Sequence, residues 1–198
     1  MRITGGMLKG RQVHIPPGVI RPSMDRMRES VFAVLGDLSG LSFLDLFSGT
    51  GIIALEAASR NAGPVEAVEA DPGKRGILIK NVSISPVRIQ CRFMSVELYV
   101  KRAKRSFNVI FCDPPFPYGY RWELIGNIAA SPLVNSETRL LIHRPREDYH
   151  EEEIPFLSMK DRREYGRSIV DFYQGRKNDP PNETQKKQIV FDKAEKYG

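Results

Sequence analysis

The amino-acid sequence predicts an α/β protein with a mostly parallel β-sheet and an antiparallel hairpin at one edge. Short apolar segments alternate with segments of helical periodicity from residue 42 to residue 143, a pattern typical of parallel strands joined by helices. Two further β-like segments, 159–165 and 168–173, follow each other across a turn at Gly166. Such a turn can join antiparallel strands, whereas parallel strands need a longer crossover.

The individual elements follow from the same periodicities. The first helix shows apolar side chains at helical spacing between Met24 and Leu38, after Ser23, which can cap its N-terminus. Further helices are expected at 51–60, 72–81, 97–104 and 122–130. The expected strands are 42–47, 65–69, 87–93, 108–112, 139–143, 159–165 and 168–173, which makes a seven-stranded sheet.

Length and composition fit one domain with short additions. The 198 residues are 41% hydrophobic, which suffices for a sizeable core and argues against a disordered or fibrous protein. No apolar run approaches the roughly 18 residues of a membrane-spanning helix, and the first residues lack a secretory signal. Cys91 and Cys112 lie in apolar segments, which is typical of buried thiols in a reducing compartment. We therefore expect a soluble cytoplasmic protein.

The net charge of +6 is concentrated near the N-terminus. Residues 1–28 contain a single acidic side chain, Asp25, and the basic side chains of Arg2, Lys9, Arg11, Arg21, Arg26 and Arg28. Glycines and prolines in this region favour turns, so we expect a β-hairpin arm over 1–20. A domain over 21–174 and a polar, flexible tail over 175–198 would follow. The arm suits a polyanionic partner; the alternative is that it packs against the sheet, with Arg28 and Glu29 as a local ion pair.

A glycine loop follows the first expected strand. Gly49 and Gly51 lack Cβ atoms, so a ligand can approach the backbone where the next helix begins. Asp45 at the strand end would repel a phosphate but stabilise a cationic group. Glu69, at the end of the second strand, is placed to accept hydrogen bonds from ribose hydroxyls. A nucleoside with a positive charge and no phosphate fits both carboxylates, and S-adenosyl-L-methionine is the common cofactor of that kind. A purely structural turn is the alternative.

A second motif follows the fourth expected strand. Asp113 is followed by Pro114 and Pro115, which fix two φ angles and lack N–H groups, and then by Phe116. Asp113 and a neighbouring carbonyl could accept the two hydrogens of an exocyclic amine while Phe116 stacks on the base. Both motifs come at carboxyl ends of strands, where open α/β sheets bind ligands. An Asp-capped structural turn is the alternative for this motif taken alone.

These motifs, in this order, resemble those of class I amino-methyltransferases. The quoted segments are 43–51 (Phe-Leu-Asp-Leu-Phe-Ser-Gly-Thr-Gly), Glu69, and 113–116 (Asp-Pro-Pro-Phe). The lead-in over residues 1–11 and 21–30 is similar to one family, the bacterial 16S rRNA guanine-N2 methyltransferases of the RsmD type, and the similarity extends to about residue 174. It implies a Rossmann-like fold and methyl transfer from S-adenosyl-L-methionine to a guanine N2.

The resemblance also implies roles for residues of this chain. The catalytic turn would be Asp113, Pro114, Pro115 and Phe116. The cofactor would contact Asp45, Phe47, Gly49, Gly51, Glu69 and Ser95. RNA phosphate would be bound by Arg2, Lys9, Arg11, Arg21, Arg26 and Arg28. The partner would be 16S rRNA, within the small ribosomal subunit, bound by a monomer without a metal or a membrane.

The sequence departs from the family pattern at two places near these motifs. Ser95 stands where the family usually has Asp or Asn to contact the adenine amine, and Glu97 is the alternative for that contact. The fifth strand ends in His143 and Arg144 instead of a typical Glu. The histidines have no metal-ligand spacing with the cysteines, and we expect no metal site.

Three other functions compete with this interpretation. A DNA adenine-N6 methyltransferase would use a similar Asp-Pro-Pro-aromatic turn but usually carries a larger target-recognition insertion. A nicotinamide-dependent dehydrogenase would use the glycine loop but leaves Asp45 and the 113–116 turn without a role. A non-catalytic RNA-binding module would need only the basic arm.

Overall fold

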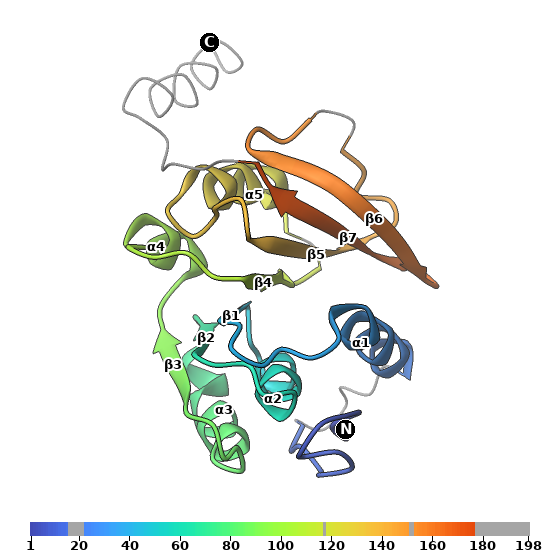
Figure 1. The fold of residues 1–198 in the computed structure, drawn as a ribbon, viewed down its shortest axis with the longest axis vertical. Helices are drawn as coiled ribbons and strands as arrows, with labels where there is room; N and C mark the ends of the chain where they lie inside the picture. The colour runs from blue at the N-terminus through green and yellow to red at the C-terminus, as the bar shows by residue number, and fades with distance from the viewer. Residues whose placement is uncertain (16–21, 117, 151–152, 177–198) are drawn as a thin grey trace.

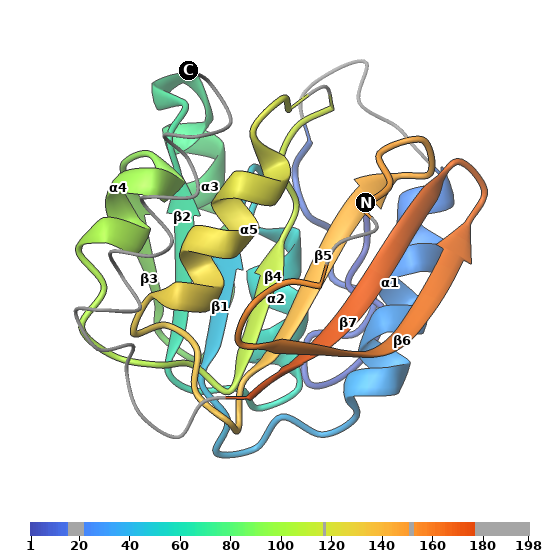
Figure 2. The same cartoon turned by 90° about the horizontal axis from the view of Figure 1, so that it is seen from above.

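In a computed structural model, the chain forms a mostly parallel sheet of seven strands among the residues that the structure describes, which are 1–15, 22–116, 118–150 and 153–176. The strand order is β3-β2-β1-β4-β5-β7-β6 (Figure 2). The first five strands run parallel, and β7 pairs antiparallel with both β5 and β6. The predicted parallel sheet with an antiparallel edge hairpin is therefore confirmed.

The strands of the described chain are β1 (Phe43–Leu46), β2 (Val65–Glu69), β3 (Ile89–Phe93), β4 (Val109–Cys112), β5 (Arg139–Pro145), β6 (Leu157–Tyr165) and β7 (Ser168–Gly175). The α-helices of the same residues are α1 (Pro22–Leu35), α2 (Ile52–Ser59), α3 (Arg75–Val82), α4 (Val96–Lys101) and α5 (Arg121–Ala130). A 3-10 turn, η1 (Pro72–Lys74), precedes α3, where the sequence predicted one continuous helix. Strand β5 continues to Pro145, beyond the predicted end at His143.

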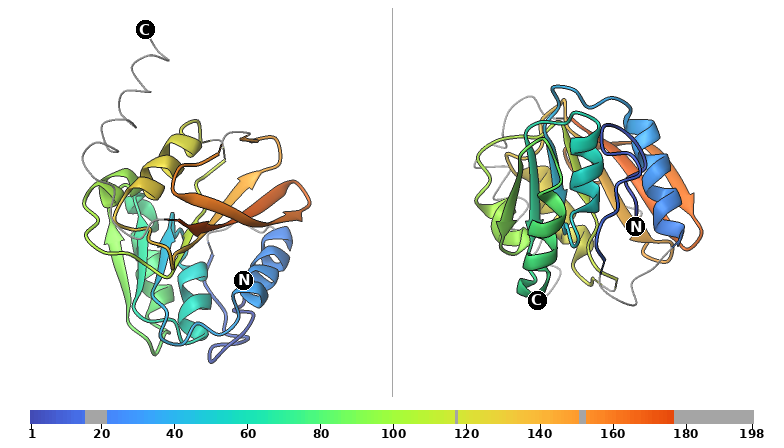
Figure 3. Two further views of the ribbon diagram at one scale, coloured as in Figure 1. Left: turned by 45° about the horizontal axis from the view of Figure 1, so that its top comes forward. Right: turned by 90° about the horizontal axis from the view of Figure 1, so that it is seen from below.

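Helices cover both faces of the sheet. Helices α2 and α3 lie on one face, and α4 and α5 on the other (Figure 1). Helix α1 lies on the first face beside α2 and reaches β6 (Figure 3, right). The central strands β1 and β4 are buried along their whole length, as expected for strands covered on both faces. The core is accordingly divided into two apolar clusters, one on each side of the sheet.

The N-terminal arm, predicted as a β-hairpin over 1–20, reverses direction within residues 1–15 and is closed by an antiparallel β-bridge between Arg2 and Gln12, while residues 16–20 lie outside the described residues. Gly6 and Gly10 adopt positive φ of 73° and 81°, a backbone region that glycine enters without steric cost, and the chain reverses between them. Ile3, Leu8 and Val13 are buried in the core cluster shared with α1 and α2. The arm is therefore an integral part of the packing against α2.

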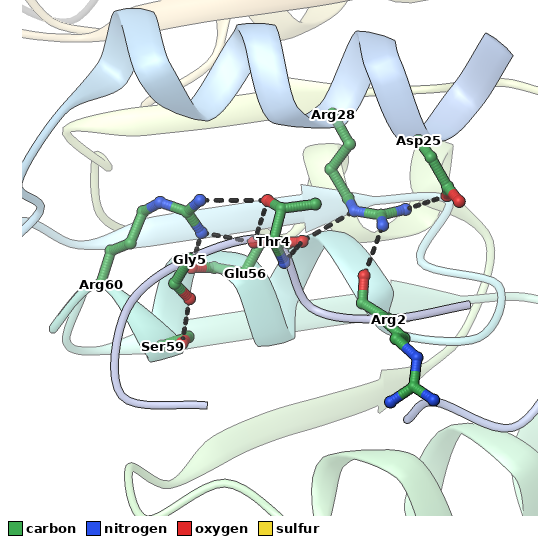
Figure 4. Close-up of polar contacts among 8 residues, drawn as sticks. All are labelled: Arg2, Thr4, Gly5, Asp25, Arg28, Glu56, Ser59 and Arg60. Atoms are coloured by element: carbon green, nitrogen blue, oxygen red, sulfur yellow. Dashed lines mark hydrogen bonds and ion pairs between the residues drawn. The ribbon is translucent and has the colours of Figure 1, made fainter. Parts of the chain in front are cut away.

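A buried carboxylate holds this arm in place (Figure 4). Glu56 of α2 is fully buried and accepts hydrogen bonds from the backbone N–H of Thr4 at 2.7 Å and from its hydroxyl at 3.0 Å. The same carboxylate pairs with Arg28 of α1 at 2.7 Å and with Arg60. Arg28 also donates to the carbonyl of Arg2 at 2.6 Å. One side chain thus joins the arm, α1 and α2.

The last strand ends near the predicted C-terminal boundary, which stays a prediction. Strand β7 ends at Gly175, next to the predicted boundary at residue 174, and most of the predicted tail lies outside the described residues. Within the described part, no helix is both long and apolar enough to cross a membrane.

Candidate active site

The two predicted motifs meet at one edge of the sheet. Strands β1 and β4 are parallel neighbours with Leu46 opposite Cys112, so the glycine loop and the Asp113 turn leave the sheet at the same edge. A cavity of about 230 Å³ lies there, lined among others by Asp45, Gly49 and Asp113. Met27 and Arg28 of α1 complete its wall. The coincidence of loop, turn and cavity defines the candidate active site.

The glycine loop has the backbone of a close-approach site. Phe47, Gly49 and Gly51 adopt positive φ of 67°, 55° and 80°, which is unusual for Phe47 because its Cβ disfavours that region. A Cβ on Gly51 would come within 2.6 Å of the Leu78 side chain, so α3 packs directly on this glycine. A Cβ on Gly49 would meet nothing closer than 4.0 Å. Space for a ligand is therefore found at Gly49, whereas Gly51 serves packing.

Asp45 is a buried carboxylate facing this cavity. Its side chain accepts the backbone N–H of Ala54 at 3.2 Å and is 1% exposed. Burial raises the pKa of Asp45 well above its ordinary value, and the charge of Asp113 adds to the rise against the Ala54 hydrogen bond. A cationic ligand group would stabilise the ionised form. The position thus fits the predicted contact with a sulfonium or amino group.

The Asp45→Asn variant should be more stable than the wild type in the absence of ligand, by an amount that grows as pH rises. Because burial raises the pKa of Asp45 in the folded protein, the unfolded chain ionises at lower pH. The free energy of unfolding therefore falls as pH rises from the unfolded pKa, about 3.9, to the folded pKa, and the loss persists at higher pH. Asn keeps an acceptor for the Ala54 N–H without ionising. Urea unfolding at pH 5 and pH 7 should show an advantage of the Asp45→Asn variant that is larger at pH 7. An identical pH dependence for both proteins would contradict this account of Asp45.

Glu69 is the last residue of β2, and Ser95 follows the end of the edge strand β3. Glu69 accepts the backbone N–H groups of Gly49 at 2.7 Å and Asp71 at 2.8 Å, so it borders the glycine loop. A carboxylate has about four acceptor sites, which leaves two for ribose hydroxyls. Ser95 caps α4 through an Oγ contact with the Leu98 N–H, and Glu97 accepts the hydroxyl of Tyr118. Both side chains are exposed, and their contact with adenine stays a prediction.

The Asp113 turn presents its polar and aromatic groups to the cavity edge. Asp113 continues the β1–β4 ladder, with its N–H donor nitrogen 3.4 Å from the carbonyl oxygen of Leu46, and its side chain is 24% exposed. Pro114 is buried, whereas Pro115 and Phe116 are exposed. This leaves Asp113 accessible to a substrate and Phe116 free to stack on a base. Trp122 of α5 packs against the second apolar cluster and donates to Asp148 at 2.8 Å.

Sequence reasoning missed His143 at this site. Its Nδ1 lies 2.7 Å from Oδ1 of Asp113, and its ring lies 5.4 Å from that of Phe116. Arg121, the first residue of α5, places its guanidinium carbon over the same Phe116 ring, 5.3 Å from the ring centre. The available signal was the pairing of β4 with β5, which puts Cys112 opposite Ile142 and hence the two following residues side by side.

The predicted RNA-contacting residues fall into different settings. Arg28 is 2% exposed and bound to Asp25, Glu56 and the Arg2 carbonyl, so the expectation that it contacts phosphate is wrong: its guanidinium is used inside the fold. The exposed members are Arg2, Lys9, Arg11 and Arg26. Arg21 lies outside the described residues.

Lys9 lies far from the cavity, whereas Arg26 lies next to it. The turn before Lys9 is bound to the last residue of α2, because Met7 donates to the Ser59 carbonyl at 2.7 Å. Helix α2 begins at the glycine loop, so Lys9 lies toward the opposite edge of the sheet. Arg26 precedes two residues that line the cavity. The described residues hold no group of three or more His, Cys, Asp or Glu side chains arranged to bind a metal.

The fold and the loop geometry define the class of protein. A seven-stranded sheet in this order, with a glycine loop after β1 and a carboxylate at the end of β2, has the Rossmann-like class I methyltransferase fold. The family model described as Conserved hypothetical protein 95 matches residues 1–174, and the chain belongs to this family. The RsmD-type resemblance predicted from the sequence is thereby confirmed.

Named relatives agree with this assignment. Ribosomal RNA small subunit methyltransferase D of Escherichia coli K12 is 33% identical over 129 residues, which are 63% of this chain and 65% of that protein, slightly under two thirds of its length. The Escherichia coli structure named "Putative methyltransferase yhhF" has a TM-score of 0.79 and 25% identity, covering 88% of this chain and 97% of that one. SMU.776, solved complexed with SAH, shares the fold at 15% identity and a TM-score of 0.62, covering 78% of this chain and 50% of that one. Together these relatives support S-adenosyl-L-methionine as the cofactor.

Proposed function

We propose that the chain is an S-adenosyl-L-methionine-dependent methyltransferase that modifies the exocyclic N2 of a guanine in 16S rRNA. The observation that carries this proposal is the shared cavity at the carboxyl edge of β1 and β4. A carboxylate suited to a cation, Asp45, and a carboxylate suited to an amine, Asp113, both line it. A cationic methyl donor and an amine acceptor would meet there.

The residues around the cavity fit the cofactor. Bound S-adenosyl-L-methionine would supply an activated methyl group on a sulfonium. Asp45 would stabilise its positive end, Gly49 would let it approach the backbone, and Glu69 would accept the ribose hydroxyls. Phe47 and Gly51 would shape the loop, and Ser95 is our proposed adenine contact, with Glu97 as the alternative.

Asp113 would act on the guanine amine. It and a carbonyl of the Pro114–Pro115 turn would accept the two amine hydrogens, which turns the nitrogen lone pair toward the methyl donor, while Phe116 stacks on the ring. The bound sulfonium would supply a methyl group and, once the amine nitrogen has bonded to the methyl carbon in line, a neutral sulfur leaving group that keeps the electron pair of the broken carbon–sulfur bond. The proton lost from the methylated amine passes to Asp113.

We further propose that the substrate is the RNA of the small ribosomal subunit, bound by a monomer in the cytoplasm. The name of the Escherichia coli relative supports the small subunit, and a ribosomal substrate implies the cytoplasm. The exposed basic residues Arg2, Arg11 and Arg26 would contact phosphate, with Lys9 at greater distance from the cavity. Arg21 is included on sequence grounds alone.

The double variant Arg11→Ala/Arg26→Ala should weaken RNA binding and flatten its salt dependence. For each phosphate interaction that the substitutions remove, the slope of log K against log salt should decrease by about 0.7 to 0.9. RNA-binding titrations between roughly 50 and 200 mM salt would measure this slope. Over that range, a protein with six or more phosphate contacts loses about a thousandfold or more in RNA affinity, so the change is large enough to detect. Lys101→Ala/Lys104→Ala, at two exposed lysines at and just after the end of α4, is the matched control and should leave the slope unchanged. Equal slopes in all three proteins would contradict the proposed phosphate contacts.

The proposed function is tested by presenting labelled S-adenosyl-L-methionine with unmodified small subunits, naked 16S rRNA and duplex DNA in parallel. Label in either RNA substrate supports it, and the comparison of the two identifies the preferred assembly state. Label in DNA alone would favour a DNA adenine-N6 methyltransferase. Calorimetry that detects no cofactor binding, together with RNA binding, would favour a non-catalytic RNA-binding protein.

A further inference from the structure

The neighbouring ends of β4 and β5 place a histidine directly against the proposed catalytic carboxylate. Cys112 and Ile142 are paired across these parallel strands, so Asp113 and His143 follow at the same level. The Nδ1 of His143 lies 2.7 Å from Oδ1 of Asp113. The partners are 30 residues apart in sequence, and the sheet alone brings them together.

The chemistry of the two groups fixes which one donates. An ionised carboxylate only accepts hydrogen bonds, so Nδ1 of His143 must carry the proton that is shared with Asp113. The other nitrogen, Nε2, is buried and has no hydrogen-bond partner among the described residues. Within the described chain, the hydrogen bond to Asp113 therefore sets the tautomer of this imidazole.

Packing holds the ring in that position. His143 is 4% exposed, and the ring of Phe116 lies against it at 5.4 Å with an interplanar angle of 48°. On its strand, His143 is paired with Val170 of β7, so its backbone is held in the sheet. A ring fixed in this way presents its N–H to one oxygen of Asp113 and leaves Oδ2 for another partner.

We propose that His143 is a positioning residue for Asp113 in the methyl-transfer reaction. Its Nδ1–H holds Oδ1, which orients the carboxylate so that Oδ2 faces the amine of the substrate. Without this hydrogen bond Asp113, whose side chain is 24% exposed, would turn freely among rotamers. This inference rests on the proposed function, in which Asp113 accepts the amine hydrogens.

The test compares His143→Leu and His143→Asn with the wild type. Leu has a similar apolar bulk but no donor, whereas Asn can place its side-chain N–H near the position of Nδ1. We expect Leu to lower kcat about tenfold or more, which is less than the roughly 10²- to 10⁴-fold loss for removing an acid–base group itself, and Asn to restore kcat to within a few fold of the wild type. Cofactor affinity by calorimetry should be unchanged in both. His150→Leu, at a histidine that stacks on Trp122, is the control and should keep wild-type kcat.

Three results of these kinetic and cofactor-binding measurements would overturn the proposal. One is wild-type kcat in the Leu variant, and another is an Asn variant as slow as the Leu variant while both remain folded. The third is a loss of cofactor affinity that accounts for the whole effect, because that would indicate a merely structural role.

A second measurement does not depend on activity. The ¹⁵N spectrum of the His143 imidazole should show the Nδ1–H tautomer in the wild type and a changed tautomer balance in Asp113→Ala. An Nε2–H tautomer in the wild type would overturn the positioning proposal. If the wild type methylates none of the three substrates, the proposed function fails, whereas this spectrum still tests the hydrogen bond, so the two failures can be told apart.

Discussion

Replacing Asp113 with Ala is expected to reduce methyl transfer by about 10²- to 10⁴-fold, the range for loss of a positioned acid–base group. Ala removes both the acceptor for the amine hydrogens and the group that takes the proton. Asn should fall between Ala and the wild type because it keeps one acceptor oxygen. Initial rates with labelled cofactor at saturating substrate would measure all three. Cofactor affinity should be retained, because Asp45 and the glycine loop are unchanged.

The control for this experiment is Asp161→Asn, at an exposed carboxylate of the edge strand β6 that pairs with Arg163. It should keep wild-type activity. Full activity in Asp113→Ala would remove the chemical basis of the proposed function. A loss of cofactor binding in that variant would show instead that Asp113 belongs to the cofactor site alone.

Replacing Glu56 with Ala should destabilise the fold by about 3–5 kcal/mol, the cost of leaving a buried charge without its partner. Glu56 is fully buried between Arg28, which is 2% exposed, and Arg60, and it also accepts both hydrogen bonds of Thr4 (Figure 4). Its loss would leave Arg28 with only Asp25 and one carbonyl among the described residues. Urea unfolding would give the difference in the free energy of unfolding.

Two further variants around Glu56 distinguish an exposed ion pair from a buried one. Asp25 is half-exposed, so Asp25→Ala, which removes the other ion pair of Arg28, should cost at most about 1 kcal/mol. The double variant Glu56→Leu/Arg28→Met removes both buried charges and should be less destabilised than Glu56→Ala. A Glu56→Ala variant as stable as Asp25→Ala would show that the arm is not held by this carboxylate.

Local patterns in the sequence predicted most of the fold. Strand β2 was predicted at its observed bounds, Val65–Glu69, because a short apolar run between a turn and a proline-led helix has few other interpretations. The ends of helices were predicted less accurately than their presence. The segment 72–81 begins with the 3-10 turn η1, which a helical periodicity does not distinguish from the first turn of an α-helix.

Long-range pairing explains what the sequence did not predict. Glu56 is the only charged residue of α2, which signals a need for a partner, but its partners Arg28 and Thr4 are 28 and 52 residues away. The same holds for His143, whose role depends on the pairing of β4 with β5. By contrast, the glycine loop and the Asp113 turn are local motifs, and their meeting at one edge followed from the parallel strand order.

The most direct test of the central claim is the identity of the methylated nucleoside. Small subunits labelled by the wild-type protein would be digested to nucleosides and separated against standards, with Asp113→Ala in parallel. We expect the label in N2-methylguanosine with the wild type and about a hundredfold less, or lower still, with Asp113→Ala in the same reaction time. Label in N6-methyladenosine, or in N2-methylguanosine at equal levels with both proteins, would contradict the account.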